Sequence, residues 1–170
     1  MFLIIRQLSL PEKKMMIFII YNLVIDIGIF LDTGFYVGLC HPKDKFASQC
    51  KTIFKKLSKG IYGLLYTSFL IISEASTLLA VRTSNNERVL NLLSKYLWGD
   101  RKIATILPYQ QSLEKEIWNL FKKVNTIDLK FEKPMSFVDI SSVIFCQHHQ
   151  IENIVSFDSH FDKFLNRIYE

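Results

Sequence analysis

An eight-residue segment near the start of the chain joins an apolar run to an abrupt polar end. Residues 27–34 read Ile-Gly-Ile-Phe-Leu-Asp-Thr-Gly. The run is too short for a helix, is partly β-branched and stops at polar residues and a glycine. This pattern predicts a buried strand that ends at Asp32. A further apolar run at residues 17–24 fits either an added strand or a helical turn.

Apolar residues recur at helical spacing in several later segments. In the clearest of them, residues 44–59, Gly60 ends the predicted helix. Ser68 or Thr67 offers an N-cap for another helix, and Ser136 opens a third. The other predicted helices span residues 69–82, 85–98, 111–124 and 137–149, with a closing helix around Phe161, Phe164 and Leu165.

Short apolar runs between these helices predict strands. They lie at residues 64–66, 103–107, 127–131 and 153–157. Strands that alternate with helices indicate an α/β sandwich with a mostly parallel sheet. No internal repeat, low-complexity segment or linker divides the chain, so we expect one domain over residues 27–170 and an amino-terminal extension over residues 1–26.

Composition narrows the classes of protein. Hydrophobic residues make up 49% of the 170 positions, which excludes a disordered chain. Asn22 and Asp26 interrupt the apolar run at residues 15–31, so we expect no membrane span there. The net charge of +5 suits a polyanionic partner.

The three cysteines are an odd number without a Cys-x-x-Cys pair. This argues against a disulfide framework and favours a reducing, cytoplasmic setting. A zinc site is an alternative to buried thiols, but its residues lack the tight paired spacing of structural zinc sites. Those residues are Cys40, His41, Cys146 and His149.

Acidic residues stand where the predicted strands end or the following helices begin. They are Asp32, Glu74, Asp139 and Asp158. In a parallel sheet these places share one edge, so the carboxylates can converge. Converging carboxylates repel one another unless a cation lies between them, and Mg²⁺ or Mn²⁺ prefers oxygen ligands.

Each carboxylate also has a purely structural interpretation. Asp32 can be a polar strand end, Asp158 a helix cap and Glu74 a solvated helix residue. Asp139 follows Ser136 by three positions, which is the spacing of a capping box. Two more aspartates, Asp44 and Asp162, are better explained as surface or capping residues.

The segments around these carboxylates resemble PIN-domain proteins, a group that includes VapC-like toxins. They occur in the order expected for that family: Phe30-Leu31-Asp32-Thr33-Gly34, Tyr66-Thr67-Ser68 leading to Glu74, Ser136-Phe137-Val138-Asp139, and Val155-Ser156-Phe157-Asp158. The resemblance implies a three-layer sandwich around a five-stranded sheet and a metal-dependent ribonuclease. It assigns metal binding and catalysis to Asp32, Glu74, Asp139 and Asp158, with support from Thr33, Ser136 and Ser156. His160 stands where many relatives carry a second acidic residue.

The resulting hypothesis is an endoribonuclease that uses Mg²⁺ or Mn²⁺ to cleave single-stranded RNA. The resemblance further implies an antitoxin protein and a homodimer. Basic residues before and on the 44–59 helix can guide the RNA backbone or simply form a solvated face; they are Lys43, Lys45, Lys51 and Lys55. A PIN-fold binding or scaffold protein with a weak site is the alternative. Gly34 argues against an aspartate-nucleophile phosphatase, and no phosphate-binding P-loop motif is present.

Overall fold

A five-stranded parallel sheet forms the centre of the structure described here. The computed structural model describes residues 9–12, 28–128 and 133–170. The strand order is β3-β2-β1-β4-β5. The strands are β1 (Gly28–Leu31), β2 (Leu64–Ser68), β3 (Thr105–Leu107), β4 (Asn153–Val155) and β5 (Asn166–Ile168).

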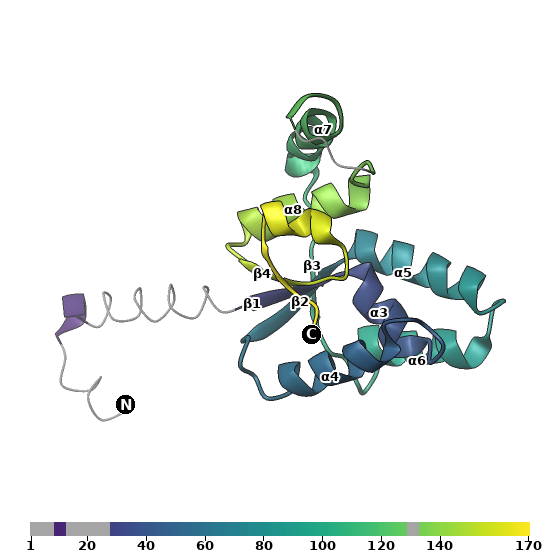
Figure 1. Ribbon diagram of the computed structural model, residues 1–170. Coiled ribbons are helices and arrows are strands. Elements are labelled where there is room, and N and C mark those ends of the chain that lie inside the picture. Colours follow the sequence, from purple (N-terminus) through teal and green to yellow (C-terminus); the bar gives the residue numbers. More distant parts are fainter. Residues whose placement is uncertain (1–8, 13–27, 129–132) are drawn as a thin grey trace.

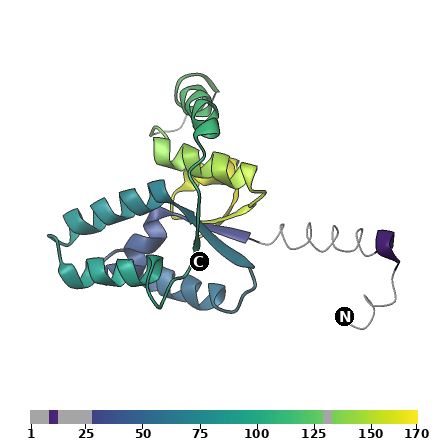
Figure 2. The same ribbon diagram turned by 180° about the vertical axis from the view of Figure 1, so that it is seen from behind.

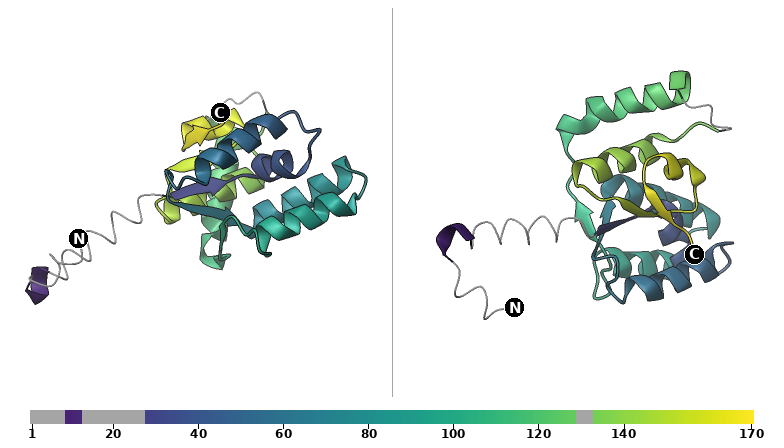
Figure 3. Two further views of the ribbon diagram at one scale, coloured as in Figure 1. Left: turned by 90° about the horizontal axis from the view of Figure 1, so that it is seen from below. Right: turned by 60° about the vertical axis from the view of Figure 1, so that its left-hand side comes forward.

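Helices cover both faces of this sheet (Figure 1). On one side lie α3 (Thr33–Cys40), α4 (Ala47–Leu57) and α6 (Glu87–Leu97), and α5 (Phe69–Arg82) runs beside α6 (Figure 2). On the other side lies α8 (Phe137–His148), with α7 (Glu114–Lys123) stacked outside it (Figure 3). The predicted three-layer α/β sandwich with a five-stranded parallel sheet is therefore confirmed, and the fold is PIN-like.

Strand β1 occupies the middle of the sheet, and all of its residues are buried. Phe30 pairs with Tyr66 on β2 and with Ile154 on β4. A Cβ atom at Gly28 would lie 2.8 Å from the Tyr66 ring, so only glycine fits beside that side chain. The apolar segment predicted as a buried strand is thus the central one, and it delivers Asp32 to the carboxyl edge of the sheet.

Helix α3 follows β1 directly and was not predicted. It is buried along most of its length, so it has no polar face and none of the periodicity that marks an amphipathic helix. Gly38 lies against α4, where a Cβ atom would approach the Cys50 sulfur to 2.4 Å. Gly38 therefore permits close packing of these two helices.

The fifth strand differs from the one predicted. The prediction of a strand over residues 127–131 is wrong at Ile127 and Asp128, which belong to a π-helical segment (Val124–Asp128) that continues α7. The rest of that prediction lies outside the described residues. Strand β5 instead follows a 3₁₀-helix, η3 (Ser159–Lys163), where a closing helix was expected, and pairs with β4.

The other predicted helices are present, and their ends follow the predicted signals. Ser68 caps α5 by accepting a hydrogen bond from the Ile71 amide at 3.3 Å. Asn86 caps α6, and Gly60 adopts a positive φ of 72° after α4. A short 3₁₀ turn (Gln111–Leu113) precedes α7. The described ranges contain no helix long and apolar enough to span a membrane, and the run at residues 17–24 lies outside them.

Candidate active site

The predicted carboxylates all line one cleft of about 610 Å³ at the carboxyl edge of the sheet. Asp32 follows β1 and is the N-cap residue of α3. Glu74 lies on α5, Asp139 in the first turn of α8, and Asp158 at the N-cap of η3 after β4. Segments far apart in the sequence thus bring Asp32, Glu74, Asp139 and Asp158 to the same cleft.

Asp32 is the most deeply placed of these residues, with 6% of its surface exposed. Its Oδ2 accepts a hydrogen bond from Ser156 Oγ at 2.7 Å, whereas Oδ1 has no hydrogen-bond partner among the described residues. Burial raises the pKa of Asp32 to about 7, and the negative charge of Asp139 adds to this effect. A buried carboxylate with a free oxygen is one that a cation would stabilise.

Ser156 links the two aspartates that follow β1 and β4. Its hydroxyl donates to Asp32 and accepts a hydrogen bond from the Asp158 amide at 3.1 Å. Asp158 Oδ1 in turn accepts from the His160 amide at 2.9 Å, and the His160 ring nitrogen Nδ1 lies 2.9 Å from the same oxygen. His160 therefore lies beside Asp158 at the cleft. It occupies the position at which many PIN-domain proteins carry a second acidic residue.

Glu74 and Asp139 are each held by a neighbouring hydroxyl residue. Thr33 Oγ1 donates to Glu74 Oε2 at 2.5 Å. Ser136 and Asp139 exchange hydrogen bonds of 3.1 Å in each direction and form the capping box. Burial raises the pKa of Asp139. Asp139 thus forms the predicted capping box and also borders the cleft.

These carboxylates suit a hard divalent cation by their chemistry, since all offer oxygen. Within the described part of the chain, however, no three acidic, histidine or cysteine side chains are arranged so that they could hold a metal ion. Glu74, Asp139 and Asp158 are each engaged by a local donor instead. The unpartnered Oδ1 of Asp32 and the mutual repulsion of the carboxylates fit a cation that would draw these groups together.

The described residues also supply no group of three ligands for the zinc site considered as an alternative. Cys40, Cys50 and Cys146 are buried and reduced. Burial raises the pKa of Cys40 and of Cys50 to about 12, as expected for inert thiols in a core.

Basic side chains also line the cleft, but they are mostly not the predicted ones. Of the four predicted lysines only Lys45 borders it; Lys43, Lys51 and Lys55 are exposed on and before α4. Arg82 and Lys133 border the cleft and were missed. Arg82 follows Glu74 by eight residues through Leu78, so the i, i+4, i+8 spacing on α5 could have revealed it.

Two aromatic rings form one wall of the cleft. Phe46 and Phe157 stack with centroids 4.0 Å apart and planes 6° apart, and Lys45 Nζ lies 4.6 Å from the Phe46 ring centre. Asp44, expected at the surface or in a cap, accepts a hydrogen bond from the Phe46 amide at 2.9 Å and also borders the cleft.

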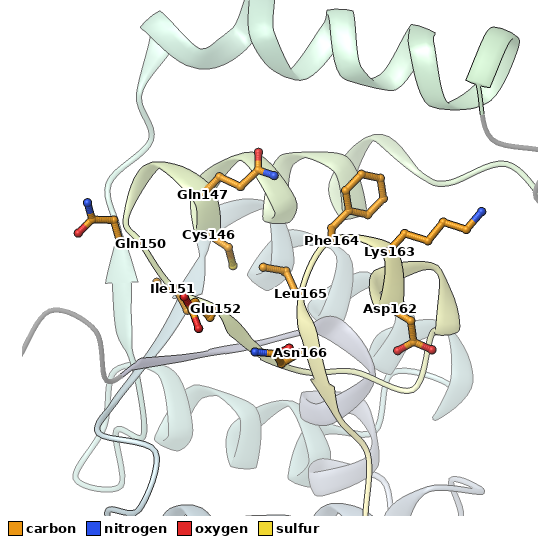
Figure 4. A pocket seen from close by; sticks show the side chains of 10 residues that line it. All are labelled: Cys146, Gln147, Gln150, Ile151, Glu152, Asp162, Lys163, Phe164, Leu165 and Asn166. Carbon is orange, nitrogen blue, oxygen red and sulfur yellow. The ribbon is translucent and has the colours of Figure 1, made fainter.

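A larger cavity of about 790 Å³ lies elsewhere and contains none of the four carboxylates predicted for the active site. Figure 4 shows the side chains around it, which come from the end of α8 and the loop before β4, from η3 and the residues after it, and from the start of β5. Two acidic residues line it, Glu152 and Asp162. Asp162 forms an ion pair with Arg167, with N···O distances of 2.6 and 2.9 Å, so its carboxylate is already neutralised.

Comparison with known proteins supports the fold assignment. No family model and no curated protein matches the sequence. Among solved structures, the chain is similar to VapC20 of Mycobacterium tuberculosis, described as a sarcin-ricin loop cleaving toxin, with a TM-score of 0.63 and 22% sequence identity. The match covers 79% of this chain and 93% of VapC20. The chain shares the VapC fold. At this identity the likeness concerns the PIN-like architecture rather than the chemistry.

Proposed function

We propose that this protein is a divalent-metal-dependent endoribonuclease that hydrolyses phosphodiester bonds of single-stranded RNA. The observation that carries the proposal is the convergence of carboxylates on one cleft, with one buried Asp32 oxygen left without a partner in the described residues. The likeness to an RNA-cleaving toxin supports it. By the same analogy we propose a toxin that an antitoxin protein controls.

In this proposal Asp32, Glu74, Asp139 and Asp158 hold Mg²⁺ or Mn²⁺. Such an ion, when bound, activates a water molecule and stabilises the departing oxygen of the phosphodiester. Ser156 fixes the rotamer of Asp32, and Thr33 fixes that of Glu74. Ser136 orients Asp139 through the capping box. Because burial raises the pKa of Asp32, protons and the cation compete for this carboxylate.

The basic residues around the cleft support single-stranded RNA as the proposed substrate class. Lys45 and Lys133 border it, and Lys43, Lys51 and Lys55 extend positive charge over the adjoining α4 surface. Phosphates along a flexible strand can follow such a path without base-specific contacts. Single-stranded RNA fits best, because a flexible strand can bend to follow this path into the cleft, whereas the phosphates of a duplex are held on the outside of a rigid helix.

We also propose a homodimer, as the resemblance implies. The surface of α7 and α8 carries aromatic residues that a partner could cover: Trp118 is 52% exposed and stacks on Phe121, which contacts Phe137. Light scattering should give twice the mass of the chain at micromolar concentration. A monomer at high concentration would remove this part of the proposal.

The decisive experiment measures manganese-dependent cleavage of a labelled single-stranded RNA. The wild type should cleave it, and Asp32→Asn should not, because the substitution preserves size but removes an anionic ligand. Asp100→Asn makes the same chemical change at an exposed site and is the matched control. Equal cleavage by Asp32→Asn and the wild type would remove Asp32 from the catalytic centre.

The second candidate is a catalytically weak PIN-fold protein that binds RNA or acts as a scaffold. The observation in its favour is that no group of described side chains is already arranged to hold a metal. A wild type that binds RNA but cleaves none of a panel of RNAs with Mg²⁺ or Mn²⁺ would establish this candidate instead.

A further inference from the structure

One cleft side chain has a contact that the proposed metal site does not explain. Arg82 stands at the last position of α5, and its Nη1 lies 3.2 Å from Asp44 Oδ2. The two residues are 38 positions apart in the sequence. This ion pair joins α5 to the turn before α4, and both of its members border the cleft.

Helix α5 presents a single line of side chains to the cleft. Glu74, Leu78 and Arg82 are spaced four residues apart and all border it. Eight residues of α-helix rise about 12 Å. Arg82 is therefore on the same face as Glu74 but about two turns away, so its guanidinium belongs to the rim of the cleft rather than to the carboxylate cluster.

Asp44 is a rigid anchor for this guanidinium. Its side chain is only 8% exposed, and it accepts the Phe46 amide at 2.9 Å. Phe46 is itself held against Phe157 in the stacked pair. The Arg82 side chain, by contrast, is 49% exposed. Asp44 thus engages one terminal nitrogen while much of the guanidinium faces solvent.

The charge of the cleft shows what this exposed surface would bind. Carboxylates from five residues border the cleft, and they repel a polyanion: Asp32, Asp44, Glu74, Asp139 and Asp158. RNA can enter only where cations offset this repulsion. A guanidinium with several N–H donors in a fixed plane binds phosphate oxygens in pairs, which a lysine cannot do.

We propose that Arg82, oriented by Asp44, is a positioning residue that binds an RNA phosphate flanking the one that is cleaved. This inference rests on the proposed ribonuclease function and specifies where the substrate strand runs. The strand leaves the carboxylate cluster along α5 toward the turn before α4. Arg82 holds the strand there and takes no part in breaking the bond.

The first test compares Arg82→Gln with Arg88→Gln, an equal loss of charge at an exposed site on α6 outside the cleft. In RNA cleavage with Mn²⁺, Arg82→Gln should raise KM about tenfold, the effect of losing one charged hydrogen-bond contact. Its kcat should stay within about twofold of the wild type, because the bond-breaking groups are untouched. A fall in kcat at unchanged KM would overturn the flanking-phosphate assignment.

The second test separates a phosphate contact from a merely structural ion pair. Binding of a labelled single-stranded RNA is measured against salt concentration in the Asp32→Asn background, which keeps the RNA intact. Loss of one phosphate contact should lower the magnitude of the slope of log K against log[salt] by about 0.7. Arg82→Gln should show this reduction and Arg88→Gln should not. An unchanged slope would overturn the proposal.

A double variant completes the comparison. If Arg82 serves only to neutralise Asp44, then Arg82→Gln combined with Asp44→Asn should restore both KM and the salt slope. If Arg82 binds phosphate, the slope should stay reduced in the double variant. Failure of the wild type to cleave or bind RNA would overturn the ribonuclease proposal itself, whereas wild-type cleavage with a normal Arg82→Gln would overturn this inference alone.

Discussion

Two hollows among the described residues, the cavity of about 790 Å³ and the cleft of about 610 Å³, differ in a way that their sizes do not reveal. The larger cavity contains Asp162, an exposed carboxylate that Arg167 pairs with and whose pKa this partner lowers. The smaller cleft contains Asp32, whose pKa burial raises to about 7 and whose Oδ1 has no partner among the described residues. The carboxylate of Asp162 is paired with a cation, whereas that of Asp32 is buried, which disfavours its ionised form.

This difference makes the cleft the candidate functional site. A protein gains no stability by burying Asp32 beside Asp139 and Glu74, because desolvation and the charges of both neighbours disfavour the ionised form of Asp32. Such an arrangement is typical of a site that uses the charges for binding or catalysis. A buried carboxylate oxygen without a partner among the described residues, rather than cavity volume, distinguishes the cleft from the larger cavity.

The largest expected effect is on activity. Asp139→Asn should abolish RNA cleavage, with a loss beyond the roughly 10–100-fold typical of removing a supporting residue. Asparagine keeps the oxygen that accepts the Ser136 amide, so helix α8 and its cap should persist in the circular dichroism spectrum. Asp162→Asn, the same change in the larger cavity, should leave cleavage unaltered. Full activity of Asp139→Asn would reduce this residue to a helix cap.

The second effect is on the pH dependence of stability without metal. The pKa of Asp32 in the folded protein is raised from 3.8 to about 7, so the folded state binds a proton that the unfolded state releases. Its contribution to stability is present below about pH 4 and is lost as the pH rises to about 7, a change of at most about 4 kcal/mol.

Thermal melting in EDTA measures this effect. The melting temperature of Asp32→Asn should exceed that of the wild type by more at pH 8 than at pH 5, because only the wild type ionises a buried carboxylate. Asp162 has the opposite sign, since its lowered pKa makes its contribution disappear as the pH falls. A difference in melting temperature between Asp32→Asn and the wild type that does not change with pH would show that the pKa of Asp32 is not raised in the folded protein.

A smaller effect is expected from the hydroxyl that links the two aspartates. Ser156→Ala removes the hydrogen bond to Asp32 Oδ2 and the acceptor for the Asp158 amide. We expect cleavage to fall about 10–100-fold, as for other residues that orient metal ligands. Ser94→Ala makes the same change at an exposed serine on α6 outside the cleft and is the control. A Ser156→Ala protein with wild-type kcat/KM would show that Asp32 needs no such support.

The smallest effect on RNA cleavage is expected from the ion pair between Asp162 and Arg167. Arg167→Gln breaks the ion pair with Asp162 at the surface of the larger cavity. Asp162 is 50% exposed, so solvent screens the pair, but the Arg167 guanidinium also lies over the Tyr169 ring. The free energy of unfolding measured with denaturant should therefore fall by about 1–2 kcal/mol, the sum of a screened ion pair and one cation–π contact. RNA cleavage should be unaffected. A large loss of activity in Arg167→Gln would mean that the larger cavity takes part in the function.

Local sequence signals were sufficient for much of the fold. The helix predicted over residues 69–82 has those bounds in the structure, because Ser68 caps it and its apolar positions face the core. The capping box at Ser136 also follows from a spacing of three residues. Helix caps and short-range periodicity depend on residues within one or two turns of each other, so they can be predicted from the sequence.

Features that depend on neighbours distant in the chain were predicted less well. Helix α3 is buried nearly all round, which removes the periodicity that reveals a helix. Residues 166–168 form the fifth strand only because β4 offers an edge to pair with, whereas Ile127 and Asp128 have no such edge and continue a helix. A short segment adopts the strand conformation when a partner satisfies its backbone groups.

Some features of the candidate site could be predicted from the sequence, and others depend on the tertiary structure. The four carboxylates could be named from their positions at strand ends and helix starts, because a parallel sheet brings its carboxyl edge together. The raised pKa of Asp32 and the Asp44–Arg82 pair could not be named, since burial and ion pairing arise only when separate segments pack. Residue type and order in the chain therefore determine which groups reach the cleft. Packing determines which of them are left without a partner, because desolvation and Coulomb interactions depend on distances in space.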